Sequence, residues 1–216
     1  METDELVLKD KKIVIMETAE KLFATNGYDA TSIRDIASAG SFNSAMISYY
    51  FGSKEQLMEG ILNYRTTVLE DVITTLLLRL KDPREKLLAI THFYIQKVFQ
   101  QQYFYLLLIQ IQALPDKHTL IRSFYNNLRY KNFKLLNNII REGEDSGLFK
   151  KDIDTALLLF TISGTMNNLL INQDYYRAVN NLEDKSEEHF ITYIKSKAEA
   201  QLTGIIEGLV LLKPQS

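Results

Sequence analysis

The fold is decided by two stretches of sequence, TSIRDIA over residues 31–37 and ISYYFGSKEQL over residues 47–57. Before them, residues 8–26 carry apolar side chains at helical spacing, and Gly27 supplies a left-handed stop. Short helices separated by sharp, individually capped turns build a small DNA-binding module. The pattern predicts a helix-turn-helix over about residues 31–50.

The helix starts in this region have recognisable capping residues. Thr31 or Ser32 is suited to cap one helix, and Asn43 or Ser44 is suited to cap the next. Residues 53–56 read Ser-Lys-Glu-Gln, which is a capping box that begins a long fourth helix. We therefore expect three short helices followed by one long helix that connects this module to the rest of the chain.

The remainder of the chain has helical periodicity and almost no alternation of period two, so an all-α fold is expected. We predict a DNA-binding domain over residues 1–54 and a larger helical domain for effector binding and dimerisation over residues 55–216. The expected helices after the fourth cover residues 83–100, 102–113, 117–144, 152–173 and 186–212.

The composition of the chain excludes several classes of protein and site. The 216 residues are 46% hydrophobic and 24% charged, with a net charge of −2 and no cysteine. Disulfides and thiolate metal sites are therefore excluded. The acidic, polar start is wrong for a signal peptide, and no apolar run approaches the ~20 residues that span a bilayer. These features predict a cytoplasmic protein that does not enter a membrane.

No set of residues predicts catalysis, a cofactor or a metal site. His92, His118 and His189 are far apart in the sequence and have no metal-ligand spacing. There is no phosphate-cradling glycine loop and no nucleophile elbow. We therefore expect a protein that is not an enzyme and has no cofactor.

The stretch from Lys12 to Ile61 resembles the TetR family of bacterial transcription regulators. The resemblance rests on the two stretches quoted above, together with Leu22-Phe23 and Gly27-Tyr28. It implies a helix-turn-helix domain followed by a helical domain that binds a ligand and dimerises. The sequence departs from the family in the turn, where glycine stands one place early and Gly40-Ser41-Phe42 results. Either this turn is rearranged, or Ser41 adopts the left-handed conformation.

Residues 44–50 are the candidate recognition helix for the major groove, because their small side chains allow the backbone to approach the bases. The alternative for each polar residue is a plain cap or surface position. Helix starts also favour phosphate, because the dipole attracts an anion. The residues predicted to contact DNA are Thr31, Ser32, Arg34, Asn43, Ser44, Ala45, Ser48, Tyr49 and Lys54.

Two of these are cations. Lys54 stands in the first turn of the fourth helix, which is unfavourable for a positive charge, and a nearby phosphate would offset that cost. A phosphate contact is therefore predicted for Lys54. Arg34 is a second phosphate candidate, and pairing with Asp35 is its alternative.

The resemblance also implies an effector pocket and a dimer interface in the larger domain. Aromatic and amide side chains predict a pocket for a moderately lipophilic molecule, although an aromatic stripe is also typical of a core. The pocket candidates are Phe93, Gln96, Phe104, Gln110, Phe124, Met166 and Asn167. Asn167 could alternatively find a partner across a dimer. Two apolar helices near the end predict a homodimer through Leu158, Ile162, Met166, Leu202, Gly204, Ile205, Gly208 and Leu209.

The sequence thus predicts a homodimeric repressor that a small effector releases from a palindromic double-stranded DNA operator. One alternative is a helix-turn-helix regulator without a small-molecule ligand, acting as an activator or under the control of a protein. The other is an all-helical enzyme. The identity of the effector and the operator sequence are not readable from the chain.

Overall fold

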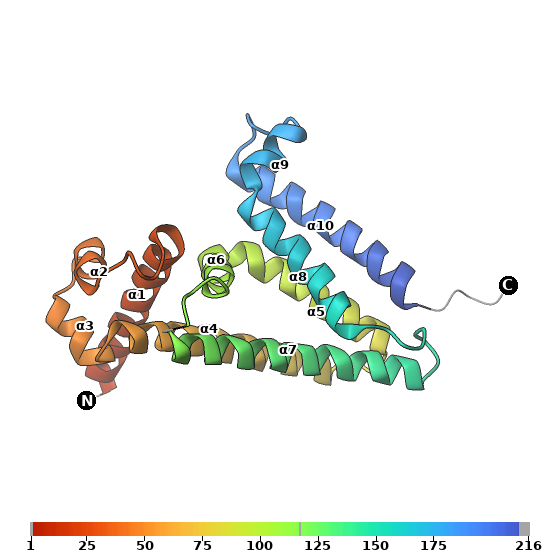
Figure 1. The fold of residues 1–216 in the computed structure, drawn as a ribbon, viewed down its shortest axis with the longest axis horizontal. Coiled ribbons are helices and arrows are strands. Elements are labelled where there is room, and N and C mark those ends of the chain that lie inside the picture. Colours follow the sequence, from red (N-terminus) through yellow and green to blue (C-terminus); the bar gives the residue numbers. More distant parts are fainter. Residues whose placement is uncertain (1, 117, 212–216) are drawn as a thin grey trace. The chain divides into compact units, whose positions relative to one another are not determined.

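The computed structural model describes residues 2–116 and 118–211, and their side chains from residue 11 onward. These residues form helices and no named strand, which confirms the all-α prediction. The helices in chain order are α1 (Glu2–Asn26), α2 (Ile33–Ala39), α3 (Ser44–Phe51), α4 (Lys54–Leu78), α5 (Pro83–Gln100), α6 (Gln102–Ile111), α7 (Thr119–Asp145), α8 (Thr155–Ile171), α9 (Gln173–Val179) and α10 (Glu187–Val210) (Figure 1).

Helix α9 was not predicted, because its seven residues are too few to show helical periodicity. The break lies at Asn172, whose side-chain amide donates to the carbonyl oxygen of Asn168 at 3.0 Å. An asparagine that bonds its neighbouring backbone competes with helix continuation. The predicted helix limits at Lys117 and Leu212 lie outside the described residues.

The described chain divides into two compact units that do not follow the predicted border at residue 54. The first combines Met1–Glu70 with Tyr103–Asn127, and the second combines Asp71–Gln102 with Leu128–Ser216. Helix α6 and the start of α7 therefore belong to the unit that contains the helix-turn-helix. The functional division into a DNA-binding domain up to residue 54 and an effector and dimerisation domain after it remains a prediction.

In the first unit, an ion pair joins α1 to α4. Arg65 donates from Nε and Nη2 to the carboxylate of Glu20 at 2.7 and 3.0 Å. The Glu20 side chain is only 5% exposed, whereas Glu17 lies 3.9 Å away and is half exposed. Burial alone lowers the pKa of Arg65, but the hydrogen bonds and charge of Glu20 raise it above its ordinary value. The arginine thus stays charged and holds the middle of α4 against α1.

Two polar contacts join the middle of the chain to α1 and the turn after it. The side-chain amide of Gln110 on α6 donates to the carbonyl oxygen of Ala24 at 2.6 Å. His118, just before α7, lies 2.9 Å from Asp29 through Nε2 and packs edge-on against the ring of Tyr28. These contacts explain why residues 103–127 belong to the first unit.

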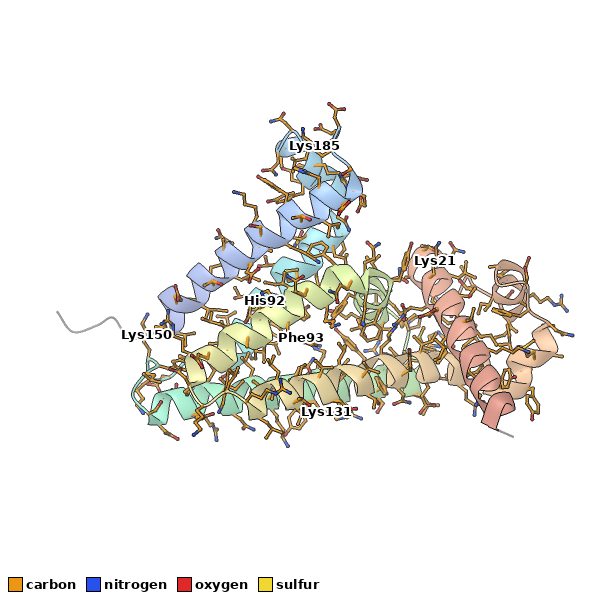
Figure 2. All side chains as sticks on the ribbon, turned by 180° about the vertical axis from the view of Figure 1, so that it is seen from behind. Lys21, His92, Phe93, Lys131, Lys150 and Lys185 are labelled. Atoms are coloured by element: carbon orange, nitrogen blue, oxygen red, sulfur yellow. The ribbon has the colours of Figure 1, made fainter. Side chains whose placement is uncertain are left out.

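In the second unit, α5 packs against α8 and α10, and α9 joins the far ends of those two helices (Figure 1). The segment after α7 closes the opposite end of α10. Lys150 donates from its backbone to the carbonyl oxygen of Val210 at 2.8 Å and from its ammonium group to that of Gly208 at 2.6 Å. Figure 2 labels Lys150 at this place.

Within the residues that the structure describes, no helix has the length and hydropathy to cross a membrane.

Candidate nucleic-acid interface

Helix α2 begins with a reciprocal cap. Ser32 is the N-cap residue, and its Oγ accepts from the backbone N–H of Asp35 at 3.2 Å. The Asp35 carboxylate in turn accepts from the hydroxyl and the backbone N–H of Ser32, both at 2.7 Å. These bonds hold the pKa of Asp35 below its usual value. Ser32 and Arg34 are both exposed at this helix start, whereas Asp35 is engaged by the cap.

Helix α3 presents small polar side chains outward. Asn43 is its N-cap residue and accepts from the backbone N–H of Ala45 at 2.8 Å. Ile47 is buried and anchors the helix to the module. The outward positions are all exposed, with Tyr49 at 83%, and they comprise Asn43, Ser44, Ala45, Ser48 and Tyr49.

The unusual turn between α2 and α3 keeps its shape through Ser41. Ser41 has φ 55°, so the left-handed alternative is the one that the chain adopts. Gly40 has φ −95°, but an added Cβ would lie 2.0 Å from the ring of Phe42. A side chain at position 40 would therefore force the Phe42 ring to move, and position 41 carries the conformational strain.

We expect Ser41→Gly to raise the free energy of unfolding by about 1 kcal/mol, because glycine adopts positive φ without steric cost. Gly40→Ala should lower it, because the new Cβ meets the Phe42 ring. Urea denaturation of both variants and the parent measures these effects. Equal stability of parent and Ser41→Gly would contradict the strain assigned to Ser41.

Two of the predicted DNA-contacting residues are engaged inside the module. The Thr31 side chain is buried, and its hydroxyl donates to the carbonyl oxygen of Gly27 at 2.8 Å. We therefore withdraw Thr31 from the predicted phosphate contacts, since its hydroxyl closes the turn. Lys54 is half-buried, and its ammonium group donates to the carbonyl oxygens of Tyr28 and Thr31.

Tyr28 links these groups, and the sequence alone did not suggest a role for it. Its ring is buried, packs on Phe23, and lies 4.4 Å from the Lys54 ammonium. Burial raises the pKa of Tyr28 to about 12, and the charges of Glu55 and Asp29 add to the shift. The Gly27-Tyr28 pair is part of the family signature, but a role for the ring emerges only once its partners are placed.

The predicted effector residues are divided between the two units. Phe104, Gln110 and Phe124 belong to the first unit, and the structure commits the amide of Gln110 to Ala24. Phe93, labelled in Figure 2, lies half-buried on α5 in the second unit, together with Gln96. Met166 is fully buried and Asn167 is half-buried on α8. The pocket remains a prediction.

The predicted dimer residues fall on two different faces of their helices. The inward-facing set consists of Leu158, Ile162, Met166 and Leu202, all buried within a single chain. These four residues belong to the core of one chain, so we no longer assign them to the dimer interface. Gly204, Gly208 and Leu209 are exposed on α10, and Ile205 is half-buried.

A second apolar stripe on α8 was missed. Leu157, Phe160 and Ile171 are 63%, 51% and 55% exposed, and they share a face with Gly164. A Cβ added to Gly164, Gly204 or Gly208 would meet nothing within 4 Å. The two faces could not be separated by sequence pattern, because α8 is apolar almost all round.

Two family models match this chain. Residues 15–61 match the one described as bacterial regulatory proteins, tetR family. Residues 65–193 match the model of the YsiA-like protein C-terminal region. The transcriptional repressor NicS of Pseudomonas putida is 25% identical over 187 residues, which cover 85% of this chain and 88% of NicS.

Two solved structures have a similar fold. The ketosteroid regulator KstR2 of Mycobacterium tuberculosis matches with a TM-score of 0.73 and 18% identity, covering 94% of this chain and 96% of that one. AibR in complex with isovaleryl coenzyme A and operator DNA matches with a TM-score of 0.68 and 20% identity, covering 90% and 96%. Together with the capped helix-turn-helix, the family matches establish that this chain belongs to the TetR family of DNA-binding bacterial transcription regulators.

Proposed function

We propose that this protein is a homodimeric repressor that binds a near-palindromic operator and is released from it by a small effector. The observation that carries the proposal is the outward face of α3, which is exposed and consists of small side chains apart from Tyr49, while Ile47 anchors the helix from within. Such a face fits the major groove, where short side chains allow close approach to the base edges.

The proposed DNA contacts come from two helix starts. Arg34 at the start of α2 supplies a phosphate contact, because its exposed guanidinium favours an anion. Ser32 supplies a second contact when its hydroxyl turns from the Asp35 carboxylate to a phosphate. Asn43, Ser44, Ala45, Ser48 and Tyr49 face the groove and its edges. The net charge of −2 gives little general attraction for DNA. Two modules acting together are therefore needed for tight binding.

The dimer that we propose uses the outward faces of α8 and α10. The exposed side chains of Leu157, Phe160 and Leu209 provide apolar area that water disfavours. Gly164 and Gly208 leave the helix surface bare, so a partner helix can approach closely. A twofold axis through this face would pair each stripe with its own copy.

The effector that we propose is a moderately lipophilic molecule bound in the helical domain. Because AibR was crystallised with isovaleryl coenzyme A, acyl thioesters of coenzyme A are the first compounds to test. Binding would need to change operator affinity by about 1–3 kcal/mol to act as a switch. A regulator without a small ligand would show no such coupling.

Selection of operator DNA from a random pool, followed by fluorescence anisotropy across a salt series, tests the proposal. Arg34→Ala should weaken binding and make the dependence of log affinity on log salt shallower by about 0.9 for each phosphate that is no longer neutralised. Arg141→Ala on α7 serves as the matched control, since Arg141 is also exposed but lies outside the proposed interface.

Two results would overturn parts of the proposal. Failure of the folded protein to enrich any sequence from the pool would remove the function as an operator-binding repressor. Specific binding that no acyl thioester or other lipophilic ligand weakens would leave a DNA-binding regulator and favour control by a protein partner.

A further inference from the structure

The ammonium group of Lys54 is held by partners within the protein. Its ammonium nitrogen lies 2.8 Å from the carbonyl oxygen of Tyr28 and 2.9 Å from that of Thr31. It also lies 4.4 Å from the centroid of the Tyr28 ring. Two carbonyl dipoles and an aromatic face together make a binding site for a cation inside the protein.

The two carbonyl groups belong to the ends of one short segment, residues 28–31, which connects α1 to α2. Within this segment the N–H of Thr31 donates to the carbonyl oxygen of Tyr28 at 3.3 Å. Lys54 approaches from the first turn of α4 and crosslinks both ends of the segment. The residue after Thr31 is Ser32, the N-cap of α2.

The same contacts offset the unfavourable interaction between the charge of Lys54 and the dipole of α4. A cation in the first turn of a helix is opposed by the helix dipole. The carbonyl oxygens of Tyr28 and Thr31 provide the compensating negative potential from within the module. A DNA phosphate is not required for that purpose, and an ammonium group that swung out to one would give up two charge-assisted hydrogen bonds.

We propose that Lys54 is a positioning residue for DNA binding: it clamps residues 28–31 and so fixes the start of α2, and it does not contact phosphate. This inference rests on the proposed function, because it assigns how the DNA-binding face is held. It predicts that loss of the ammonium group weakens DNA binding because the start of α2 must then be ordered during binding, whereas Arg34 still neutralises the same phosphate in the complex.

The salt dependence of DNA binding separates the two roles. Lys54→Met keeps the aliphatic stem and removes the charge. We expect its affinity to fall on the order of tenfold, while the slope of log affinity against log salt stays that of the parent. A slope that is shallower by about 0.9 per subunit would mean that Lys54 neutralises a phosphate, and it would overturn the proposal. Arg34→Ala provides the shallower slope for comparison.

Amide hydrogen exchange gives a second readout that needs no DNA. In Lys54→Met, amides of residues 29–35 should exchange faster, whereas those of α3 should keep their parental rates. Lys21→Met is the matched control, since Lys21 on α1, labelled in Figure 2, lies over the ring of Tyr103 on α6 but is exposed. Parental exchange rates at residues 29–35 in Lys54→Met would overturn the clamp.

Lys54→Arg keeps the test decisive if the methionine variant does not fold. It preserves a charge for phosphate but replaces a compact ammonium group with a planar fork. We expect weaker binding with the parental salt slope and faster exchange at residues 29–35. Parental affinity together with parental exchange would overturn the proposal. If the parent itself selects no DNA, the proposed function fails, while the exchange experiment still decides whether the clamp exists.

Discussion

Arg65→Met should lower the free energy of unfolding of the first unit by about 3–5 kcal/mol, because it leaves the buried Glu20 carboxylate without its partner. Arg65 donates two hydrogen bonds to that carboxylate, and the Glu20 side chain is 5% exposed. An uncompensated charge at such a position costs far more than the loss of a surface pair. Urea denaturation followed by circular dichroism measures the change.

Two further variants separate the cost of leaving a buried carboxylate unpaired from the cost of losing an exposed ion pair. Glu17→Gln removes the exposed neighbour of Arg65 and should cost less than about 1 kcal/mol. The double variant Glu20→Met with Arg65→Met removes both buried charges and should recover much of the stability that Arg65→Met alone removes. If Arg65→Met were no less stable than Glu17→Gln, the buried pair would not hold α1 and α4 together.

If the proposed dimer forms through α8 and α10, Leu157→Arg should convert it to a monomer and weaken operator binding on the order of 100-fold or more. A charge at the centre of an apolar interface is left without a partner, and each separated module then binds its half-site alone. Sedimentation velocity measures the oligomeric state, and anisotropy with operator DNA measures the affinity.

Leu78→Arg is the control for Leu157→Arg, because Leu78 is even more exposed, at 82%, but lies at the end of α4. It should leave the dimer and its operator affinity intact. A Leu157→Arg protein that remains dimeric at micromolar concentration would place the interface elsewhere on the surface.

Local signals in the sequence were enough to predict the helix-turn-helix. Capping chemistry gave Thr31 or Ser32 for one cap and Asn43 or Ser44 for the next, and the caps that form are Ser32 and Asn43. The left-handed conformation of Ser41 is likewise one of the two alternatives predicted for the turn. These predictions succeeded because each depends on residues within four positions of one another. The same local reasoning predicted most of the long helices and missed α9, which has only seven residues and begins directly after Asn172 ends α8.

Predictions that depend on distant partners were less successful. The first-turn position of Lys54 led to the prediction of a phosphate contact, and its partners inside the protein, the carbonyl groups of Tyr28 and Thr31, could not be foreseen because they lie more than twenty residues away in the sequence. Met166 was assigned to both the pocket and the dimer, but it is buried in the core. An apolar residue on a uniformly apolar helix carries no information about which neighbour covers it.

The discontinuous first unit has a consequence for synthesis of the chain. Ribosomes deliver α1 to α4 well before residues 103–127, which supply Gln110 to α1 and His118 to the following turn. The emerging DNA-binding segment thus has all of its own helices but lacks part of its final surroundings. Its last contacts form only after α5 has also been translated, so completion of this unit is tied to synthesis of more than half of the protein.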